Sequence, residues 1–99
     1  MKAIQKFVER IEEEIEDAAY YAEKAVECKA AGNMRDAEKY REMASDELKH
    51  GTMLHEMATV AITQLNKVFK PTTEMQEKWD HSHKIFVERV AWIKQMLAM

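Results

Sequence analysis

Three residues, Glu14, Glu47 and His50, have the side-chain types and the spacing that a metal site in a helical protein needs. Glu47 and His50 are three positions apart, so on a helix their side chains point to the same side. A carboxylate from one helix and a Glu-x-x-His pair from its neighbour form half of a di-metal carboxylate site in a helix bundle. Such a site requires two helices that place Glu14 level with the other two residues.

The composition of the chain indicates long helices. Its 99 residues are 46% hydrophobic and 33% charged, and only three of them are Gly or Pro. Folds with many strands need far more turn-forming residues than this. We therefore expect an all-α protein, with residues 1–99 forming a single domain, since one domain usually contains about 100–150 residues.

Two short segments interrupt the helical pattern. Gly32-Asn33 combines a residue that ends helices with one that caps the next. Pro71-Thr72-Thr73 ends the second run, and a threonine there can cap the third. We predict helices over about residues 3–31, 34–69 and 73–97, the first two joined by a short turn and therefore packed as an antiparallel hairpin.

A heptad seam runs along each of the first two predicted helices, and each seam contains one glutamate. The first consists of Ile4, Phe7, Ile11, Glu14, Ala18, Tyr21, Ala25 and Cys28, and the second of Ala37, Tyr40, Ala44, Glu47, Gly51, Leu54, Ala58, Ala61, Leu65 and Val68. A charged carboxylate among core positions is costly unless it is paired, hydrogen-bonded or bound to a metal. The two glutamates are therefore the first candidates for a function.

The register of the hairpin brings these residues level. Glu14 lies 18 residues before Gly32, and Glu47 and His50 lie 15 and 18 residues after it. At a rise of about 1.5 Å per residue, they are about 27, 22 and 27 Å from the turn, within one helical turn of each other. Gly51 costs a helix about 1 kcal/mol relative to Ala. We interpret it, with Ala18 and Ala44, as leaving the volume that two ions require.

The segments around these residues resemble the ferritin-like superfamily, in particular its rubrerythrin-like and encapsulated-ferritin branch. Residues 13–21, EEIEDAAYY, look like the first helix of that family, and residues 46–50, DELKH, look like its Glu-x-x-His segment. The resemblance covers about residues 7–69. It implies a di-iron protein that oxidises Fe²⁺ (a ferroxidase) in iron storage or oxidative-stress defence, with Glu14, Glu47 and His50 as catalytic metal ligands. Mn and Zn also suit this donor set.

The chain contains one Glu-x-x-His, whereas a full ferritin or rubrerythrin contains two. Asp80-His81-Ser82-His83 cannot supply the second, because residues two apart point to different sides of a helix. The encapsulated ferritins meet the same deficit by dimerising. The resemblance therefore implies a homodimer, or a higher homo-oligomer, in which two hairpins form a ferritin-like four-helix bundle around a shared site. Residues 94–99 continue the helical pattern and show no tail that targets an encapsulin-type shell.

Several other residues have two possible interpretations. The resemblance implies that Glu13 and Glu16 form a metal entry site, but they also fit a solvated acidic surface, which is the interpretation that we favour. Tyr21 is a core aromatic or, as a second reading, a hydrogen-bond partner of a ligand carboxylate. We expect His55 at the surface and His81 on an outer helix face, and we leave the role of His83 open. Four methionines fit core filling: Met53, Met57, Met75 and Met96.

Charge and cysteine content argue against other classes of protein. Fifteen basic and 18 acidic residues give a net charge of -3, with no basic stripe of the kind that binds nucleic acid. One cysteine cannot form an internal disulfide. The longest uncharged run, residues 57–66, is too short to cross a membrane. We expect a cytoplasmic protein, either free or inside a protein nanocompartment.

The alternative is a non-enzymatic helical module for protein–protein interaction or scaffolding. Residues 32–37, followed by Ala44, resemble the turn and second helix of a tetratricopeptide repeat. Only one such unit is present, and three or more are usually needed for stability. A plain scaffold also leaves the paired Glu47 and His50 without a reason.

Overall fold

The computed structural model describes residues 2–99, and the side chains from residue 4 onward. Met1 lies outside the described residues, so the predicted domain 1–99 is seen without it. Three helices, α1 (Lys2–Ala30), α2 (Met34–Asn66) and α3 (Thr73–Leu97), account for the regular structure of the described residues, with no strand among them. The all-α prediction is thus confirmed. The molecule is a rod with extents of 55 × 18 × 17 Å.

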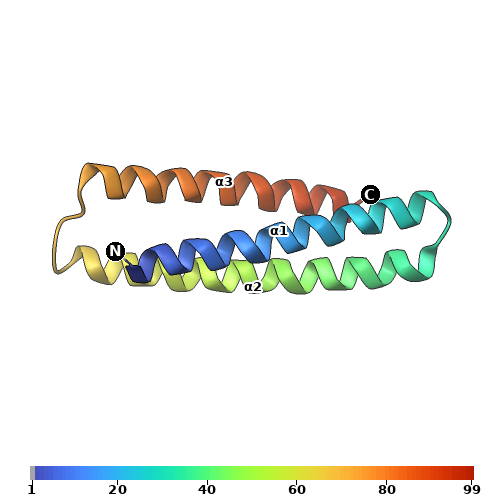
Figure 1. The fold of residues 1–99 in the computed structure, drawn as a ribbon, viewed down its shortest axis with the longest axis horizontal. Helices are drawn as coiled ribbons and strands as arrows, with labels where there is room; N and C mark the ends of the chain where they lie inside the picture. Colours follow the sequence, from blue (N-terminus) through green and yellow to red (C-terminus); the bar gives the residue numbers. More distant parts are fainter. Residues whose placement is uncertain (1) are drawn as a thin grey trace.

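The three helices lie side by side along the rod, with α1 between α2 and α3 in Figure 1. The chain reverses at each connection, so α1 and α2 form the predicted antiparallel hairpin and α3 runs parallel to α1. α1 packs extensively on α2 and less extensively on α3, whereas contact between α2 and α3 is sparse. The third helix therefore covers one side of the hairpin and leaves the other side open.

The turn between α1 and α2 forms as its residues predict. Gly32 has a φ of 79°, in the left-handed region that favours glycine. The N–H of Asn33 donates to the Cys28 carbonyl at 2.8 Å, and that of Gly32 to Lys29 at 3.0 Å, which satisfies the last carbonyls of α1. The Asn33 side chain accepts from the Asp36 N–H and so caps α2. This tight turn fixes the register of the hairpin.

The second helix ends three residues earlier than predicted, at Asn66 instead of residue 69. Beyond it, the N–H groups of Lys67 and Val68 donate to carbonyls three residues back, a tighter pattern than that of an α-helix. Pro71 cannot donate a hydrogen bond and disfavours helical geometry in the residue before it. The apolar residues Val68 and Phe69 extended the periodic pattern past the true end. Thr72 then caps α3 by accepting from the Met75 N–H, as predicted.

Small side chains dominate the interface between the helices. Ala18, Ala22, Ala44 and Ala58 are fully buried. Gly51 is buried as well, and a Cβ at this position would lie 2.7 Å from the Cδ1 atom of Ile15. Our interpretation that Gly51 leaves room for ions is therefore corrected. The Ile15 side chain occupies this space, and the glycine is needed because α1 and α2 approach closely here.

The prediction that four methionines fill the core is wrong for two of them. Met96 is buried and Met75 is half-buried, but Met53 and Met57 are more than half exposed. With Met43 and Val60, which are also exposed, they form an apolar stripe on α2 that we call the methionine face. Helical spacing alone could not separate this second stripe from the core, because both repeat at intervals of three and four residues.

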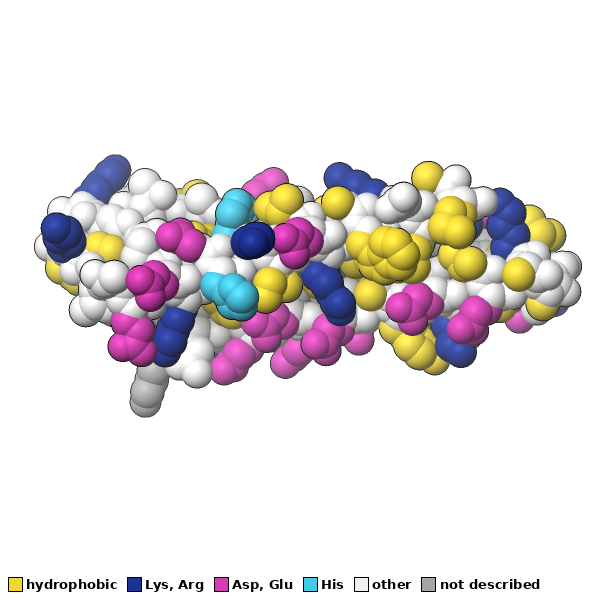
Figure 2. Space-filling model, turned by 90° about the horizontal axis from the view of Figure 1, so that it is seen from above, with side chains coloured by type: hydrophobic (Ala, Val, Ile, Leu, Met, Phe, Trp, Pro, Cys, Tyr) yellow, Lys and Arg dark blue, Asp and Glu magenta, His cyan; other side chains and the backbone are white. Residues whose placement is uncertain are grey.

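Three further exposed apolar side chains lie on α3. Ile85, Val87 and Trp92 are 42–53% exposed. Figure 2 looks at the molecule from the α3 side and shows hydrophobic side chains gathered toward the C-terminal end of the rod. This agrees with the wide spread of apolar residues around the third helix in the sequence, since one neighbouring helix cannot cover all of them.

The expectation that His55 is a surface residue is also wrong. The ring is half-buried between α2 and α3, stacked on Phe86 with centroids 4.1 Å apart and on Trp79 at 5.6 Å. Burial, with a smaller effect from the positive charge of His83, lowers the pKa of His55 from its ordinary value. The third helix supplies this environment, so the spacing of residues in the second helix could not reveal it.

Within residues 2–99, no helix combines the length and the apolar character needed to cross a membrane.

Candidate metal centre

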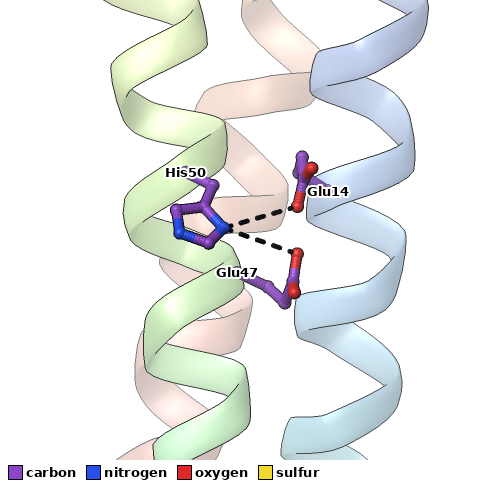
Figure 3. A group of neighbouring side chains, drawn as sticks. All are labelled: Glu14, Glu47 and His50. Atoms are coloured by element: carbon purple, nitrogen blue, oxygen red, sulfur yellow. Dashed lines mark ion pairs between the residues drawn. The ribbon is translucent and has the colours of Figure 1, made fainter.

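The structure brings together the three predicted metal ligands, Glu14, Glu47 and His50. Glu14 projects from α1, and Glu47 and His50 project from α2 toward it (Figure 3). One ligand atom from each residue lies within 4.8 Å of the other two. The Nδ1 atom of His50 is 3.9 Å from Glu14 Oε2 and 4.0 Å from Glu47 Oε2. This is the only such group of three among the described residues.

The hairpin holds these side chains in place through the close approach of its helices. A Cβ on Gly51 would lie 3.6 Å from the Cβ of Glu14, so the two residues face each other across the interface. Ala18 and Ala44, both fully buried, are each within one turn of a ligand on the same helix. The register predicted from the turn is therefore confirmed, because the side chain of Glu14 lies close to those of Glu47 and His50.

The cluster is enclosed on the carboxylate side and open on the imidazole side. The Glu14 side chain is 13% exposed and that of Glu47 is 25% exposed, whereas that of His50 is 56% exposed. In Figure 3 the third helix passes behind the hairpin, away from the cluster. An ion can therefore reach both carboxylates from solvent without displacing any of the three helices.

The two carboxyl groups are close enough to share a proton. A hydrogen bond with Glu14 raises the pKa of Glu47 to about 7, and burial and the negative charge of Glu14 act in the same direction. His50 opposes the shift. Two carboxylates side by side repel each other, and a proton between them relieves the repulsion. A bound cation would relieve it in the same way.

Arg10 is part of the site, and the sequence analysis missed it. Its guanidinium donates to Glu14 Oε1 at 2.9 Å and to Glu13 Oε2 at 2.6 Å. It thus binds the oxygen of Glu14 opposite the one that faces His50. The signal was present, because Arg10 precedes Glu14 by four positions and such residues are neighbours on a helix.

The second-tier residues lie outside the cluster of three. Glu13 is exposed and paired with Arg10, at the edge of the site. Glu16 lines a hollow on the α3 side of the molecule. Tyr21 stacks on Tyr40 with ring centroids 6.2 Å apart, and within residues 4–99 its hydroxyl makes no hydrogen bond to a carboxylate.

The donor set and its spacing suit a divalent metal ion. Ligands about 2.1 Å from a common ion lie about 3.0–4.2 Å from one another. The separations of 3.9 and 4.0 Å between His50 Nδ1 and the two carboxylates fall in that range. Two carboxylates and one imidazole are donors accepted by Fe²⁺, Mn²⁺ and Zn²⁺. The residues therefore fit one ion per chain after small adjustments of their side chains.

Fold and site together define an all-α protein with a carboxylate–histidine cluster between two antiparallel helices. Comparisons with protein-family models, with curated proteins and with solved structures find no match to this chain. The resemblance to the ferritin-like superfamily thus depends only on the motifs of this sequence.

Proposed function

We propose that this chain is a di-iron, ferritin-like ferroxidase whose site is shared between two copies of the chain. The observation that carries the proposal is the convergence of Glu14, Glu47 and His50 into one open cluster. The short turn at Gly32 and Asn33 sets the register that brings them level. The raised pKa of Glu47 marks a position between two carboxyl groups that a cation can occupy in place of a proton.

A shared site follows from the number of donors. One chain offers two carboxylates and one imidazole at this place, which is enough for one ion but not for two. A second copy doubles the set to four carboxylates and two imidazoles, the usual ligands of a di-metal site in a four-helix bundle. Each hairpin then supplies half of the bundle.

The methionine face gives the second copy a surface on which to dock. Met43, His50 and Met57 follow one another at intervals of seven residues. Met53 lies between His50 and Met57, and Val60 follows Met57 by three residues. The four apolar members are 41–60% exposed. A heptad stripe of this kind is typical of a helix that packs against another helix. Because His50 belongs to the same stripe, docking here would bring the two clusters together.

Each residue of the cluster then has a role toward the substrate ion Fe²⁺. Glu14 and Glu47 would chelate and bridge the ions, and His50 would be a terminal ligand at the open side. Two Fe²⁺ ions would each give up one electron, and the two electrons, with two protons from solvent, would reduce O₂ to H₂O₂ or H₂O₂ to water. The protein holds the ions in place with open coordination positions. Glu47 gives up its proton when an ion binds, because the cation replaces that proton between the carboxylates.

Anaerobic titration with Fe²⁺, followed by exposure to air, tests this function. We expect about one iron per chain and an absorbance change on oxidation. Glu47→Ala should abolish both, whereas Glu42→Ala, an exposed glutamate on the same helix, should abolish neither. A wild-type protein that binds no more Fe²⁺ than Glu47→Ala would exclude a ferroxidase.

The exposed methionine face also favours the alternative, a helical interaction module without catalysis. The two functions differ in what drives association. A ferroxidase with a shared site should dimerise more strongly when Mn²⁺ or Fe²⁺ is present. An interaction module should associate to the same extent with and without metal, and should show no oxidation of Fe²⁺.

A further inference from the structure

A second group of potential metal ligands lies between α2 and α3, apart from the cluster described above. The Nε2 atom of His55 on α2 is 2.9 Å from the Nδ1 atom of His83 on α3. His55 is half-buried and His83 is exposed, so the pair lies at the rim of the helix interface. Histidine side chains are visible on the α3 side of the molecule in Figure 2.

The distance between the two nitrogens is close to that of two ligands on one ion. In a tetrahedral site with metal–nitrogen bonds of 2.0–2.1 Å, neighbouring nitrogens are about 3.3 Å apart. The pair would need to open by only a few tenths of an ångström to admit an ion. Each ring offers one nitrogen to the other, and in the metal-free protein one of these nitrogens must donate a proton and the other accept it.

The pair borders a hollow that carboxylate side chains also line. His55 and His83 line a hollow of about 260 Å³ that also contains Glu12 and Glu16 of α1. Trp79 and Phe86 form its apolar wall. An ion bound by the two imidazoles would complete a four-donor set with water, and with one of these carboxylates once its side chain turns toward the pair.

We propose that His55 and His83 form a second metal site, which binds a divalent transition ion of the Zn²⁺ type and ties α3 to α2. The site is distinct from the Glu14, Glu47 and His50 cluster. His55 is five residues beyond His50, which turns it about 140° around the helix. The proposal does not depend on the proposed ferroxidase, because the two sites share no residue.

The arrangement of the helices gives such a tie a structural consequence. The third helix packs mainly on α1 and makes only sparse contact with α2. An ion bound by His55 of α2 and His83 of α3 would link these two helices directly. Binding would then stabilise the folded chain, since an ion that binds only the folded form adds to its stability.

The test begins from a variant that lacks the first cluster, Glu47→Ala with His50→Ala. Zn²⁺ titration of this variant should still show about one high-affinity ion per chain. Adding His83→Ala should weaken Zn²⁺ binding about tenfold or more, a loss of at least 1.4 kcal/mol. Adding His81→Ala, an exposed histidine two positions away, should leave the affinity unchanged. His83→Cys, which restores a zinc ligand, should recover binding.

Fluorescence offers a second readout that locates the ion. The ring of Trp79 is 5.6 Å from that of His55 and 6.4 Å from that of His83, centroid to centroid. In a Trp92→Phe background, Cu²⁺ should quench Trp79, and His83→Ala should prevent the quenching while the helical circular dichroism is retained. No high-affinity Zn²⁺ in the starting variant, or equal binding by His83→Ala, would overturn the proposal.

Discussion

The carboxyl group of Glu47 on α2 is hydrogen-bonded to that of Glu14 on α1, and this contact raises the pKa of Glu47 to about 7. Near pH 7 the Glu47 carboxyl group is therefore about half protonated, next to the negative charge of Glu14. Loss of that proton places two negative charges side by side, and they repel each other. Metal binding and protonation therefore compete for one position.

The first prediction concerns the pH dependence of metal binding. Below a pH of about 7, an ion must displace the proton of Glu47, so affinity for Mn²⁺ should rise with pH and level off above that value. Calorimetry in buffers of different ionisation enthalpy should detect proton release at pH 6 and much less at pH 8. An affinity that does not change between these two pH values would contradict the shared proton.

The stability of the metal-free protein should fall as the pH rises, whereas its affinity for metal should increase. A carboxyl group whose pKa is raised by folding stabilises the folded state at low pH, fully below 4.5, and loses this contribution as the pH rises through about 7. The free energy of unfolding of the wild type, relative to Glu47→Gln, should therefore fall between pH 5 and pH 8. Urea unfolding with a chelator present measures it. A free energy of unfolding, relative to Glu47→Gln, that increases between pH 5 and pH 8 would contradict a raised pKa of Glu47.

Arg10 should oppose metal binding without adding much to stability. Its positive charge is bound to Glu14 and repels a second cation at the same carboxylate. Arg10→Gln should raise the affinity for Mn²⁺ several-fold and change the free energy of unfolding by less than about 1 kcal/mol, because the guanidinium is mostly exposed. Arg35→Gln, on the exposed surface at the start of α2, is the matched control and should change neither.

Gly51 and Ile15 should be energetically coupled. A Cβ on Gly51 would lie 2.7 Å from Ile15 Cδ1, and Ile15→Val removes that methyl group. Gly51→Ala adds the Cβ. Gly51→Ala and Ile15→Val together should lower the free energy of unfolding by about 1 kcal/mol less than the sum of the two single effects. Urea unfolding of the four proteins of the double-mutant cycle measures the difference. Strict additivity would show that the helices can separate here at no cost.

The methionine face should control association. Met57→Lys introduces a charge into the apolar stripe beside the cluster, and should lower the fraction of dimer formed with Mn²⁺ at least tenfold. Val87→Lys, which changes an apolar residue of similar exposure on α3, serves as the control. Sedimentation of the wild type and both variants, with and without metal, measures the effect. A wild type that stays monomeric when loaded with metal would exclude the shared site.

The sequence by itself determined the three helices, the turns between them and the register of the first two. Gly32 and Asn33 end one helix and begin the next through contacts within a few residues, and such local contacts can be read directly from the chain. Once the turn is fixed, the constant rise of a helix places Glu14 opposite Glu47 and His50. The end of α2 was predicted too late, because Val68 and Phe69 continue the apolar pattern beyond the last helical hydrogen bonds.

Only the tertiary structure decided where the third helix lies and what each side chain meets there. Apolar residues are spread around α3, so its periodicity points to no single partner, and its packing on α1 depends on side-chain shape. The contact of His55 with His83 and the place of Gly51 against Ile15 follow from that packing. Spacing along a chain fixes which residues share a helix face. The distances between faces depend on the side chains that fill the space between them.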